Sequence, residues 1–311
     1  MDGAAMPAFV LGIDFGGTKV AFGTADPGGR LLASARIEND GRPADAVVAH
    51  ALRAAAALAA RTAADTGGRL AAAGAVSPGV VGEDGIRLAP NVAGWEDLRL
   101  PALVRDALGL GAVAFGNDVK AAALAEARWG ALRGADPAVF INLGTGLAAG
   151  IVAGGHVLAG AHGAAGEIGY SLRGTGDAAG AAHGRAPLEE AVAGRGIGER
   201  ASALLGGAWT AADAFASDDP AAAGLVDDAL AELAVHIANL AIALDPARIA
   251  LGGGLMRDAA RILPVLRARL DLAVPFPPEL VPAAFVDDGA LRGAVALALE
   301  PQNQRIKEEV P

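Results

Sequence analysis

Apolar runs broken by short turns divide the first part of the chain into strands. Residues 9–15 read as a buried strand of continuous apolar type, with Asp14 as the one charged residue near its end. The glycine pair at 16–17 supplies a tight turn, and residues 20–24 read as the returning strand. After a second turn, residues 31–37 predict another strand. The pattern therefore predicts an antiparallel meander in this part of the chain.

Helical and strand-like segments then alternate. The pattern predicts helices over 44–64, 101–108 and 119–129, and strands over 70–76 and 112–115. The two strands run into short polar loops, with the letters S-P-G at 77–79 and G-N-D at 116–118. Predicted helices and strands therefore alternate in the first half of the chain.

A second strand–turn–strand pattern opens the other half. Strands are predicted over 139–143 and 147–152, with a hairpin continuing over 151–158. Residues 163–184 form a glycine-rich loop region. Beyond residue 188 the pattern is mostly helical, with one strand over 249–251 that a run of three glycines ends.

Composition limits the classes of function. The chain has 311 residues, enough for two domains, and 53 % of them are hydrophobic, enough for a sizeable core. It has no cysteine, which excludes disulfides, thiolate nucleophiles and cysteine-ligated metals. A net charge of −10 argues against nucleic-acid binding but is compatible with one bound nucleotide. Neither a membrane span nor a secretory signal is recognisable, so a cytoplasmic protein without a membrane partner is expected.

The first candidate for phosphate chemistry has the letters D-F-G-G-T-K. Gly16 and Gly17 permit a close approach, so backbone amides can turn toward a polyphosphate. Thr18 adds a hydroxyl and Lys19 adds a positive charge. Asp14, at the end of its strand, can hold Mg²⁺ through a water molecule. An ordinary Gly-Gly hairpin would carry the same residues, and this alternative stays open.

Two further glycine turns are candidates for nucleotide binding. Gly144, Thr145 and Gly146 lie between predicted strands and can cradle phosphate in the same way. The letters G-T-G-L-A-A also fit a dinucleotide-binding fingerprint, but that motif requires a helix next, and here a hairpin follows. The Walker A pattern is absent, because the sequence contains no Gly-Lys pair. The glycines at 252–254 suit contact with adenine or ribose, or simply close packing of a strand on a helix.

Carboxylates beside these turns are candidates for binding hydroxyl groups. Asp118 follows Asn117 at a strand end, where it can accept a proton from a hydroxyl that attacks phosphorus. Capping of the next helix is the alternative role for Asp118. Glu167, Glu189 and Glu190 can accept hydrogen bonds from sugar hydroxyls. The last two can instead be solvated acids in the first turn of a helix.

The histidines and Trp95 have simpler interpretations. None of the five histidines is spaced with another as a metal pair, so structural or exposed positions are expected. Trp95 follows Gly94 and is expected to be a packing anchor.

The order of these motifs is more specific than any one of them. Along the chain the motifs read D-F-G-G-T-K, S-P-G, A-P-N-V-A-G-W, N-D, L-G-T-G, G-A-A-G-E-I-G, L-E-E and G-G-G. This series resembles the ROK family, which contains bacterial glucokinases, fructokinases, amino-sugar kinases and some sugar-responsive repressors. The resemblance extends from about residue 9 to residue 298.

The resemblance implies an α/β protein of the actin/hexokinase-like (ribonuclease H-like) fold. Two domains are expected, one over 1–117 that the helix over 289–300 completes, and one over 118–288. In this family ATP and the sugar occupy the cleft between the domains. A homodimer or homotetramer is also implied.

The resemblance also assigns roles to residues. It implies Asp118 as the catalytic base, and ATP with Mg²⁺ as cofactors, with Asp14 near the metal. Nucleotide-binding positions by this likeness are Asp14, Gly16, Gly17, Thr18, Lys19, Gly144, Thr145, Gly146, Gly252, Gly253 and Gly254. Sugar-binding positions are Gly79, Asn91, Asn117, Asp118, Glu167, Tyr170 and Glu189.

The chain departs from the family pattern around the expected sugar site. Tyr170 stands where the family usually has a histidine, and the three zinc-binding cysteines are missing, so no zinc is expected. A Gly/Ala-rich stretch over 173–187 replaces the zinc loop, and Val119-Lys120 replaces the usual Ala-Asn. These changes concern the identity of the acceptor more than phosphoryl transfer.

Several functions are compatible with these motifs. The leading hypothesis is phosphorylation of the primary (C6) hydroxyl of a hexose, with glucose as the default. A kinase for an amino sugar or cyclitol, of the kanosamine or N-acetylmannosamine type, is the alternative. A repressor is disfavoured, because little chain precedes Asp14 to hold a DNA-binding domain. A non-catalytic sugar-binding protein is the remaining possibility.

Overall fold

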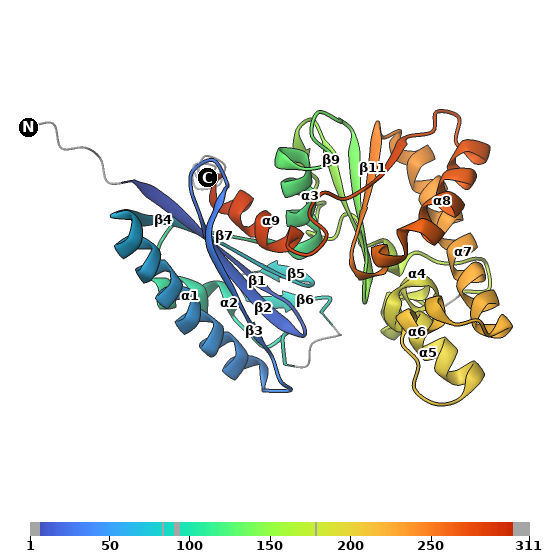
Figure 1. Ribbon diagram of the computed structural model, residues 1–311, viewed down its shortest axis with the longest axis horizontal. Helices are drawn as coiled ribbons and strands as arrows, with labels where there is room; N and C mark the ends of the chain where they lie inside the picture. The colour runs from blue at the N-terminus through green and yellow to red at the C-terminus, as the bar shows by residue number, and fades with distance from the viewer. Residues whose placement is uncertain (1–6, 83, 90–93, 178, 301–311) are drawn as a thin grey trace, which may run out of the picture. The chain divides into compact units, whose positions relative to one another are not determined.

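The computed structural model describes residues 7–82, 84–89, 94–177 and 179–300. The chain divides into two compact units (Figure 1). Unit 1 comprises Met1–Ala125 and Asp288–Pro311, and unit 2 comprises Glu126–Asp287. Each unit is built around a five-stranded mixed sheet.

The sheet of unit 1 begins with the predicted antiparallel meander, which is confirmed. Its strand order is β3 (Leu31–Glu38), β2 (Lys19–Ala25), β1 (Ala8–Phe15), β4 (Arg69–Ser77) and β7 (Val113–Asn117). β1 pairs antiparallel with β2 and β2 with β3, whereas β1, β4 and β7 run parallel. The carboxyl ends of β1, β4 and β7 therefore meet at one edge of the sheet.

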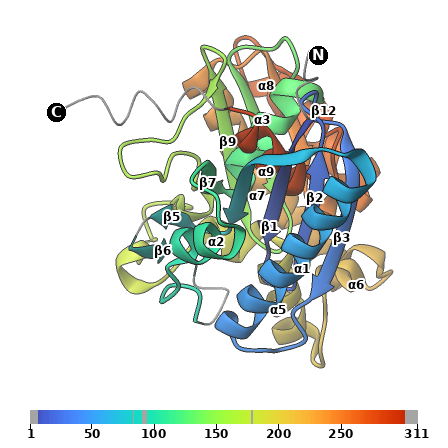
Figure 2. The same cartoon turned by 90° about the vertical axis from the view of Figure 1, so that its left-hand side faces the viewer.

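Helices cover both faces of this sheet. Unit 1 contains α1 (Ala44–Thr66), α2 (Leu100–Leu108), most of α3 (Asp118–Trp129) and α9 (Gly289–Ala298). Along β1, Leu11 and Ile13 pack into a cluster with buried residues of α1, while Gly12 lies against Val295 of α9. Because side chains alternate across a strand, α1 and α9 lie on opposite faces (Figure 2). Cover on both faces explains why β1 is apolar except for Asp14 near its end.

A small hairpin in unit 1 was not predicted. It joins β5 (Val80–Gly82) to β6 (Gly85–Arg87) directly after β4. Each strand has three residues, which is too short for an alternating pattern to register.

The sheet of unit 2 opens in the same way as that of unit 1. Its order is β10 (His156–Val157), β9 (Leu147–Ala153), β8 (Ala138–Leu143), β11 (Arg248–Gly252) and β12 (Glu279–Pro282). β8 pairs antiparallel with β9, and β9 with β10, while β8, β11 and β12 run parallel. β12 was missed in the sequence, because proline breaks strand patterns and is tolerated mainly at sheet edges, where β12 lies.

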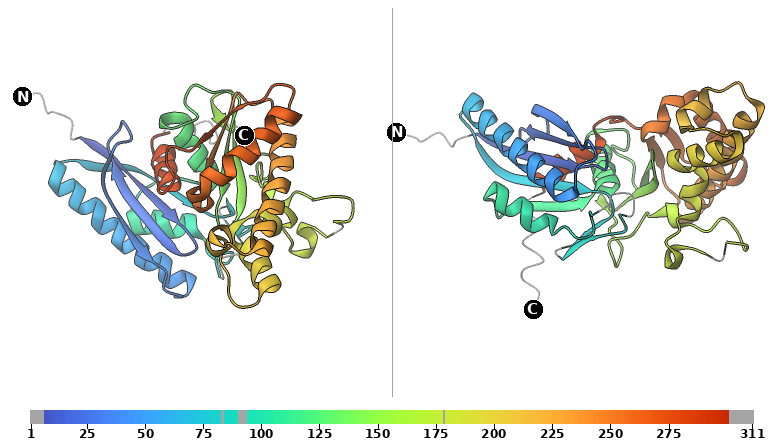
Figure 3. Two further views of the ribbon diagram at one scale, coloured as in Figure 1. Left: turned by 45° about the vertical axis from the view of Figure 1, so that its right-hand side comes forward. Right: turned by 90° about the horizontal axis from the view of Figure 1, so that it is seen from below.

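The remainder of unit 2 is mostly helical, as predicted. Its helices are α4 (Pro187–Val192), α5 (Gly194–Leu205), α6 (Ala211–Ala216), α7 (Pro220–Leu244) and α8 (Ala259–Ala273). Short 3₁₀ turns are η1 (Ile168–Tyr170), η2 (Ala181–His183) and η3 (Gly254–Asp258). α7 and α8 pack side by side (Figure 3). Across the described ranges, no helix combines the length and apolarity that a bilayer crossing requires.

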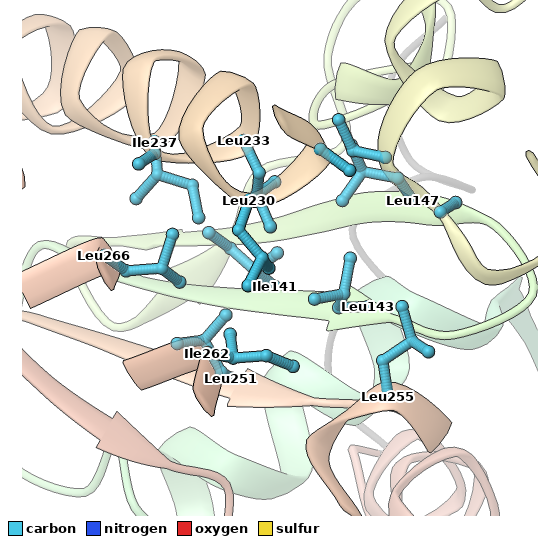
Figure 4. Packing of buried hydrophobic residues seen from close by; sticks show 14 of the residues in the cluster. Ile141, Leu143, Leu147, Leu230, Leu233, Ile237, Leu251, Leu255, Ile262 and Leu266 are labelled. Carbon is cyan, nitrogen blue, oxygen red and sulfur yellow. The ribbon is translucent and has the colours of Figure 1, made fainter. Parts of the chain in front are cut away.

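Buried aliphatic side chains anchor the turns of unit 2. Figure 4 shows Leu143 and Leu147, which flank the Gly-Thr-Gly turn, packed in one cluster with residues of α7 and α8. Leu251 and Leu255, which flank the triple glycine, belong to the same cluster. Burying one such side chain stabilises a fold by about 1.5–3 kcal/mol. Both glycine turns are therefore held at each end by the core.

Candidate functional site

One side chain sets the direction of the first glycine turn. Asn39 Nδ2 donates to the carbonyls of Gly16 (3.0 Å) and Gly17 (2.8 Å), and the Asn39 N–H donates to the Thr18 carbonyl (2.8 Å). In a planar trans peptide the N–H points opposite to the C=O. The N–H groups of Gly17, Thr18 and Lys19 therefore point away from Asn39. Successive amides turned to one side make a concavity that binds anions.

Asn39 is a residue that the sequence analysis missed. Its side chain is 8 % exposed, and its Oδ1 has no hydrogen-bond partner among the described residues. With Asp40 and Gly41 it reads as an ordinary turn. The link to the glycine turn arises only because Lys19 of β2 pairs with Glu38 of β3.

Two carboxylates lie close together at the carboxyl edge of the unit 1 sheet. Asp14 is partly buried near the end of β1, and Asp118 follows β7. The pKa of the Asp14 carboxyl is raised to about 7, mainly by burial and next by the negative charge of Asp118, while Lys19 acts in the opposite direction. A divalent cation would relieve this repulsion, and carboxylate oxygens are ligands that Mg²⁺ prefers. Asp14 and Asp118 therefore fit a magnesium ion chemically.

Asn117 caps α3 and ties it to a neighbouring loop. Its Oδ1 accepts from the N–H groups of Val119 and Lys120, both at 3.0 Å, and its Nδ2 donates to the Gly79 carbonyl at 3.0 Å. Asp118 Oδ1 also accepts from the Val119 N–H, at 2.8 Å. The capping role that the sequence suggested for Asp118 thus belongs chiefly to Asn117. The network brings Gly79, Asn117 and Asp118 together.

Trp95 packs against the end of β4 and donates a hydrogen bond to Ser77. The indole is 1 % exposed, its Nε1 donates to Ser77 Oγ at 2.5 Å, and its ring centroid lies 6.3 Å from that of Phe15. The expectation that Trp95 is a packing anchor is confirmed. Asn91, which the resemblance assigns to the sugar, lies outside the described residues.

In unit 2, Glu189 is built into the second glycine turn. Its Oε2 accepts from the Leu147 N–H at 2.9 Å. A Cβ at Gly146 would meet the same oxygen at 2.6 Å, so a larger residue there would displace the Glu189 carboxylate. The Glu189 side chain is 17 % exposed, whereas Glu190 pairs with Arg185 near the surface. The two acids of α4 therefore have different roles, and only Glu189 contacts the turn.

The short turn η1 brings further polar residues to α4. Glu167 and Tyr170 are both partly buried, and the Tyr170 N–H donates to the Glu167 carbonyl at 3.2 Å. η1 packs against α4 and β9. Glu167, Tyr170 and Glu189 thus come from adjoining elements of unit 2.

A cavity of about 620 Å³ opens beside the second glycine turn. Its walls are α5, the connection from α5 to α6, and η3. The residues lining it are Gly144, Thr145, Gly194, Arg195, Gly198, Glu199, Ser202, Trp209, Thr210, Ala211, Ala212, Gly254 and Leu255. Of the triple glycine, Gly254 lines the cavity, while Gly252 ends β11 and Gly253 makes the turn with φ +94°. The cavity combines glycine backbone, hydroxyls, one indole and a charged pair.

Comparison with known proteins identifies the family. The sequence profile of the ROK family matches residues 10–301. The chain belongs to the ROK family. It is 31 % identical over 297 residues to a kanosamine kinase of Amycolatopsis mediterranei, which covers 93 % of this chain and 95 % of the relative.

Solved structures of ROK proteins share the fold. A ROK hexokinase from Thermus thermophilus matches with a TM-score of 0.79 and 30 % identity over 96 % of this chain and 99 % of that one. A ROK glucokinase from Streptomyces griseus, in complex with glucose and AMPPNP, matches with a TM-score of 0.73 and 28 % identity over 93 % and 99 %. The expected actin/hexokinase-like α/β fold is therefore confirmed.

The sequence analysis missed most of the cavity of this ROK protein. Arg195, Glu199 and Ser202 lie in α5, and Trp209 lies in the connection to α6; neither segment has a motif of its own. One signal was readable. Thr210 begins a T-x-x-D capping box, in which its hydroxyl accepts from the Asp213 N–H at 3.1 Å and its own N–H donates to Asp213 at 2.8 Å.

Binding of a metal ion by side chains alone would need several ligands in one group. Within the ranges that the structure describes, His, Asp and Glu side chains form no group of three or more that could hold a metal ion. The fit of Asp14 and Asp118 to magnesium therefore depends on further oxygen ligands from phosphate and water, as is usual for this ion.

Proposed function

We propose that this ROK protein is an ATP-dependent sugar kinase that phosphorylates the primary (C6) hydroxyl of a hexose, with glucose as the default acceptor. The observation that carries the proposal is the orientation of the first glycine turn. The carbonyls of this turn accept hydrogen bonds from Asn39, so the N–H groups of the turn point the other way and form an anion-binding site. Phosphoryl transfer needs chiefly such positioning and charge neutralisation. The named kinases among the relatives support the same chemistry.

The residues of unit 1 have complementary roles in this proposal. Thr18 and Lys19 bind the phosphates, together with the amides of Gly16 and Gly17. Asp14 would hold Mg²⁺ through a water molecule, and the bound ion would supply positive charge to offset that of the phosphates. Asp118 accepts the proton of the attacking hydroxyl. The raised pKa of Asp14 and its repulsion by Asp118 support a cation at this edge of the sheet.

The cavity of unit 2 suits the rest of the nucleotide. Its volume of about 620 Å³ falls within the usual range of about 300–1,000 Å³ for small-molecule sites. Trp209 offers a flat face to adenine, and Gly254 allows close approach of the ribose. Thr145 and the glycines beside it lie where the phosphate chain would begin. Trp209 is fixed for this task, since its N–H donates to Ser202 Oγ at 2.8 Å and its Nε1 to the Gly206 carbonyl at 3.0 Å.

The acceptor is proposed from two further sets of residues. In unit 1 these are Gly79, Asn91 and Asn117, and in unit 2 they are Glu167, Tyr170 and Glu189. Carboxylates accept hydrogen bonds from sugar hydroxyls, and a site built for one hydroxyl pattern rejects others strongly.

An amino-sugar or cyclitol kinase is the second candidate. It is favoured by Tyr170, whose phenol can donate one hydrogen bond and accept others, and by the likeness to a kanosamine kinase. A non-catalytic sugar-binding protein is the least supported alternative. We also propose a cytoplasmic homodimer or homotetramer, which light scattering after size-exclusion chromatography would test.

A coupled assay for ADP across a panel of sugars tests the proposal. The panel contains glucose, mannose, glucosamine, N-acetylmannosamine and kanosamine, each with wild type and with Tyr170→Phe. Sugar-dependent ADP release supports the kinase, and the highest kcat/KM names the acceptor. If no sugar stimulates ADP release although ATP binds, the kinase proposal fails. If glucose leads and Tyr170→Phe leaves the ranking unchanged, the phenol has no role in selectivity.

A further inference from the structure

The two five-stranded sheets share one arrangement of strands. In unit 1, β1 lies between its hairpin partner β2 and the parallel strand β4. In unit 2, β8 lies in the same way between its hairpin partner β9 and the parallel strand β11. Both β1 and β8 end in a glycine turn that leads back into the second strand of the hairpin. Residues at equivalent places in the two sheets can therefore be compared directly.

Asn142 of β8 occupies the place that Asp14 occupies in β1. Each lies in the second pair from the glycine turn of its hairpin, with Asp14 opposite Ala21 and Asn142 opposite Ala148. Each also pairs with a residue near the end of the parallel neighbour, β4 or β11. Asn142 is therefore the counterpart in unit 2 of a residue that the proposed function places beside the nucleotide.

The Asn142 side chain does not contribute to the hydrophobic core. Its neighbours Ile141 and Leu143 belong to the buried cluster of Figure 4. Because side chains alternate across a strand, Asn142 lies on the opposite face of the sheet. It is partly buried, and within the described part of the chain neither atom of its amide group makes a hydrogen bond. The fold therefore leaves the donors and the acceptor of this amide unused.

The amide lies between the two glycine turns of unit 2. A Cβ at Gly144 would lie 3.5 Å from Asn142 Nδ2, and a Cβ at Gly253 would lie 2.8 Å from Asn142 Oδ1. Gly144 and Gly254 both line the cavity. A larger residue at 144 would stand against Nδ2, whereas glycine leaves that side of the amide uncovered. The N–H donors of Asn142 are thus directed at the turn that is proposed to hold phosphate.

We propose that Asn142 donates a hydrogen bond from Nδ2 to the phosphate chain of the nucleotide, beside the second glycine turn. This inference rests on the proposed kinase function, in which that turn binds phosphate. A primary amide carries two N–H donors, and a hydrogen bond to a charged oxygen is stronger than one to a neutral acceptor. The amide is also neutral, so it does not repel the phosphates as a carboxylate at this place would.

Two substitutions distinguish binding of phosphate from a role in spacing the turns. Asn142→Asp keeps the shape of the side chain but replaces the N–H donors by a negatively charged acceptor. Asn142→Ala removes the donors and adds no charge. If Asn142 binds phosphate, the aspartate variant is the weaker binder of the two. If Asn142 only keeps the two turns apart, the order is reversed, because aspartate preserves the spacing and alanine does not.

Calorimetry with ATP and with adenosine measures this order. Both ligands are titrated into wild type, Asn142→Ala, Asn142→Asp and Asn239→Ala, with EDTA present so that no metal ion offsets the added charge. Asn239 is exposed on α7 and lies outside the cavity, so its variant controls for the loss of an asparagine. Asn142→Ala should weaken ATP binding by about tenfold, and Asn142→Asp by about a hundredfold. Adenosine, which has no phosphate, should bind all four proteins alike within about twofold.

The outcomes separate this inference from the proposed function. If Asn142→Asp binds ATP as tightly as wild type or more tightly than Asn142→Ala, or if adenosine affinity falls in parallel with ATP affinity, the role of Asn142 is wrong. The kinase proposal then stands as long as the wild type transfers phosphate to a sugar. If the wild type binds no ATP, both are overturned. Equal thermal melting shows that the fold is kept, and if Asn142→Ala does not fold, the comparison of Asn142→Asp with wild type decides.

Discussion

At the residue scale, Asn39 shows how one buried amide can shape a binding surface. Its Nδ2 and N–H hold three successive carbonyls of the first glycine turn. Removing the side chain would leave two carbonyls at a partly buried position without their donor, at a cost of about 1–3 kcal/mol for each unpaired group. The turn would then rotate its peptides toward water, and the outward line of amides would be lost.

Asn39→Ala should therefore affect ATP more than sugar. We expect the KM for ATP to rise by about tenfold or more, because each 1.4 kcal/mol lost from binding is a factor of ten. Sugar affinity without nucleotide should change by about twofold or less. Steady-state kinetics and sugar titrations measure both, with the exposed neighbour change Asp40→Asn as the control. An unchanged KM for ATP would show that the turn keeps its shape without Asn39.

Asp14 predicts a pH dependence of magnesium–nucleotide binding. With its pKa at about 7, this carboxyl is largely protonated below that pH in the unliganded protein and then cannot serve a cation. The affinity for MgATP should weaken as pH falls from about 8 to 6, with a slope of up to about tenfold per pH unit. Calorimetry in buffers of different ionisation enthalpy should show proton release on binding. A flat profile would contradict the prediction.

The same shift predicts an opposite effect on stability. The folded pKa of Asp14 lies above the ordinary value of 3.8, so the folded state binds this proton more tightly. That stabilisation is complete below about pH 4 and is lost as pH rises through about 7. Asp14→Asn should thus melt at a higher temperature than wild type at about pH 8, while losing MgATP affinity. At about pH 5 the two proteins should melt alike.

Asp118 is expected to act as the general base. Asp118→Asn keeps the shape of the side chain next to the Asn117 cap, so the fold and sugar binding should survive. Because general-base catalysis contributes about 10²–10⁴-fold, kcat should fall by at least about a hundredfold. Rapid-quench measurement of phosphoryl transfer provides the test. Retention of more than about a tenth of wild-type kcat would exclude the role.

At the scale of elements, the long apolar strands could be predicted from the sequence. The short strands, and the side chains that contact distant segments of the chain, could not. The strand–turn–strand openings of both sheets were predicted, since each apolar run has one place to bury itself. β5 and β6 are too short for a pattern, and β12 contains a proline. The Asn39 side chain reaches the first glycine turn through the pairing of β2 with β3, which local sequence does not encode.

The connection from η1 to α4 illustrates an element held by ion pairs. Arg173 makes paired hydrogen bonds to Glu232 of α7, with Nη2–Oε2 at 2.8 Å. At the other end Arg185 pairs with Glu190 of α4, and this guanidinium lowers the pKa of that carboxyl. These two ion pairs thus hold both ends of a glycine-rich loop that joins the elements carrying Tyr170 and Glu189.

Breaking one of these ion pairs should loosen the loop without unfolding the protein. Exposed pairs are worth about 0–1 kcal/mol each, so Arg173→Gln should lower the melting temperature only slightly. Local opening should become up to about fivefold more frequent, since 1 kcal/mol is about that factor. Elastase cleavage near Ala181, followed by mass spectrometry, measures this opening. Arg30→Gln removes a comparable exposed pair, with Asp26, and should leave the cleavage rate unchanged.

At the scale of the whole molecule, the chain leaves unit 1 at Ala125 and re-enters it at Asp288. Glu126, the first residue of unit 2, is fully buried, and its carboxylate accepts from the N–H groups of Ala131 (2.6 Å), Ala284 (3.1 Å) and Phe285 (2.8 Å). The last two lie close to the end of unit 2. One carboxylate thus joins the first and last segments of that unit.

Glu126→Gln should destabilise the protein strongly. An amide has one acceptor oxygen in place of two and would direct its own N–H groups at backbone donors. We expect a loss of about 2–4 kcal/mol, because hydrogen bonds to a charged group contribute about 1.5–3 kcal/mol each. For a unit of this size that corresponds to a fall of about 5–10 °C in the melting temperature. Scanning calorimetry tests this, with the exposed Glu279→Gln, which loses the pair with Arg248, as the control.

The contacts of Glu126 also bear on how the chain can be cut and rejoined. Because the chain enters and leaves unit 2 at neighbouring points, residues 126–287 have the connectivity of a cassette inserted into a host. A short flexible bridge between residues 125 and 288 can replace the cassette without stretching the host chain. Exchanging cassettes between related proteins would then transplant the Glu189 turn and the Arg195 cavity as one module.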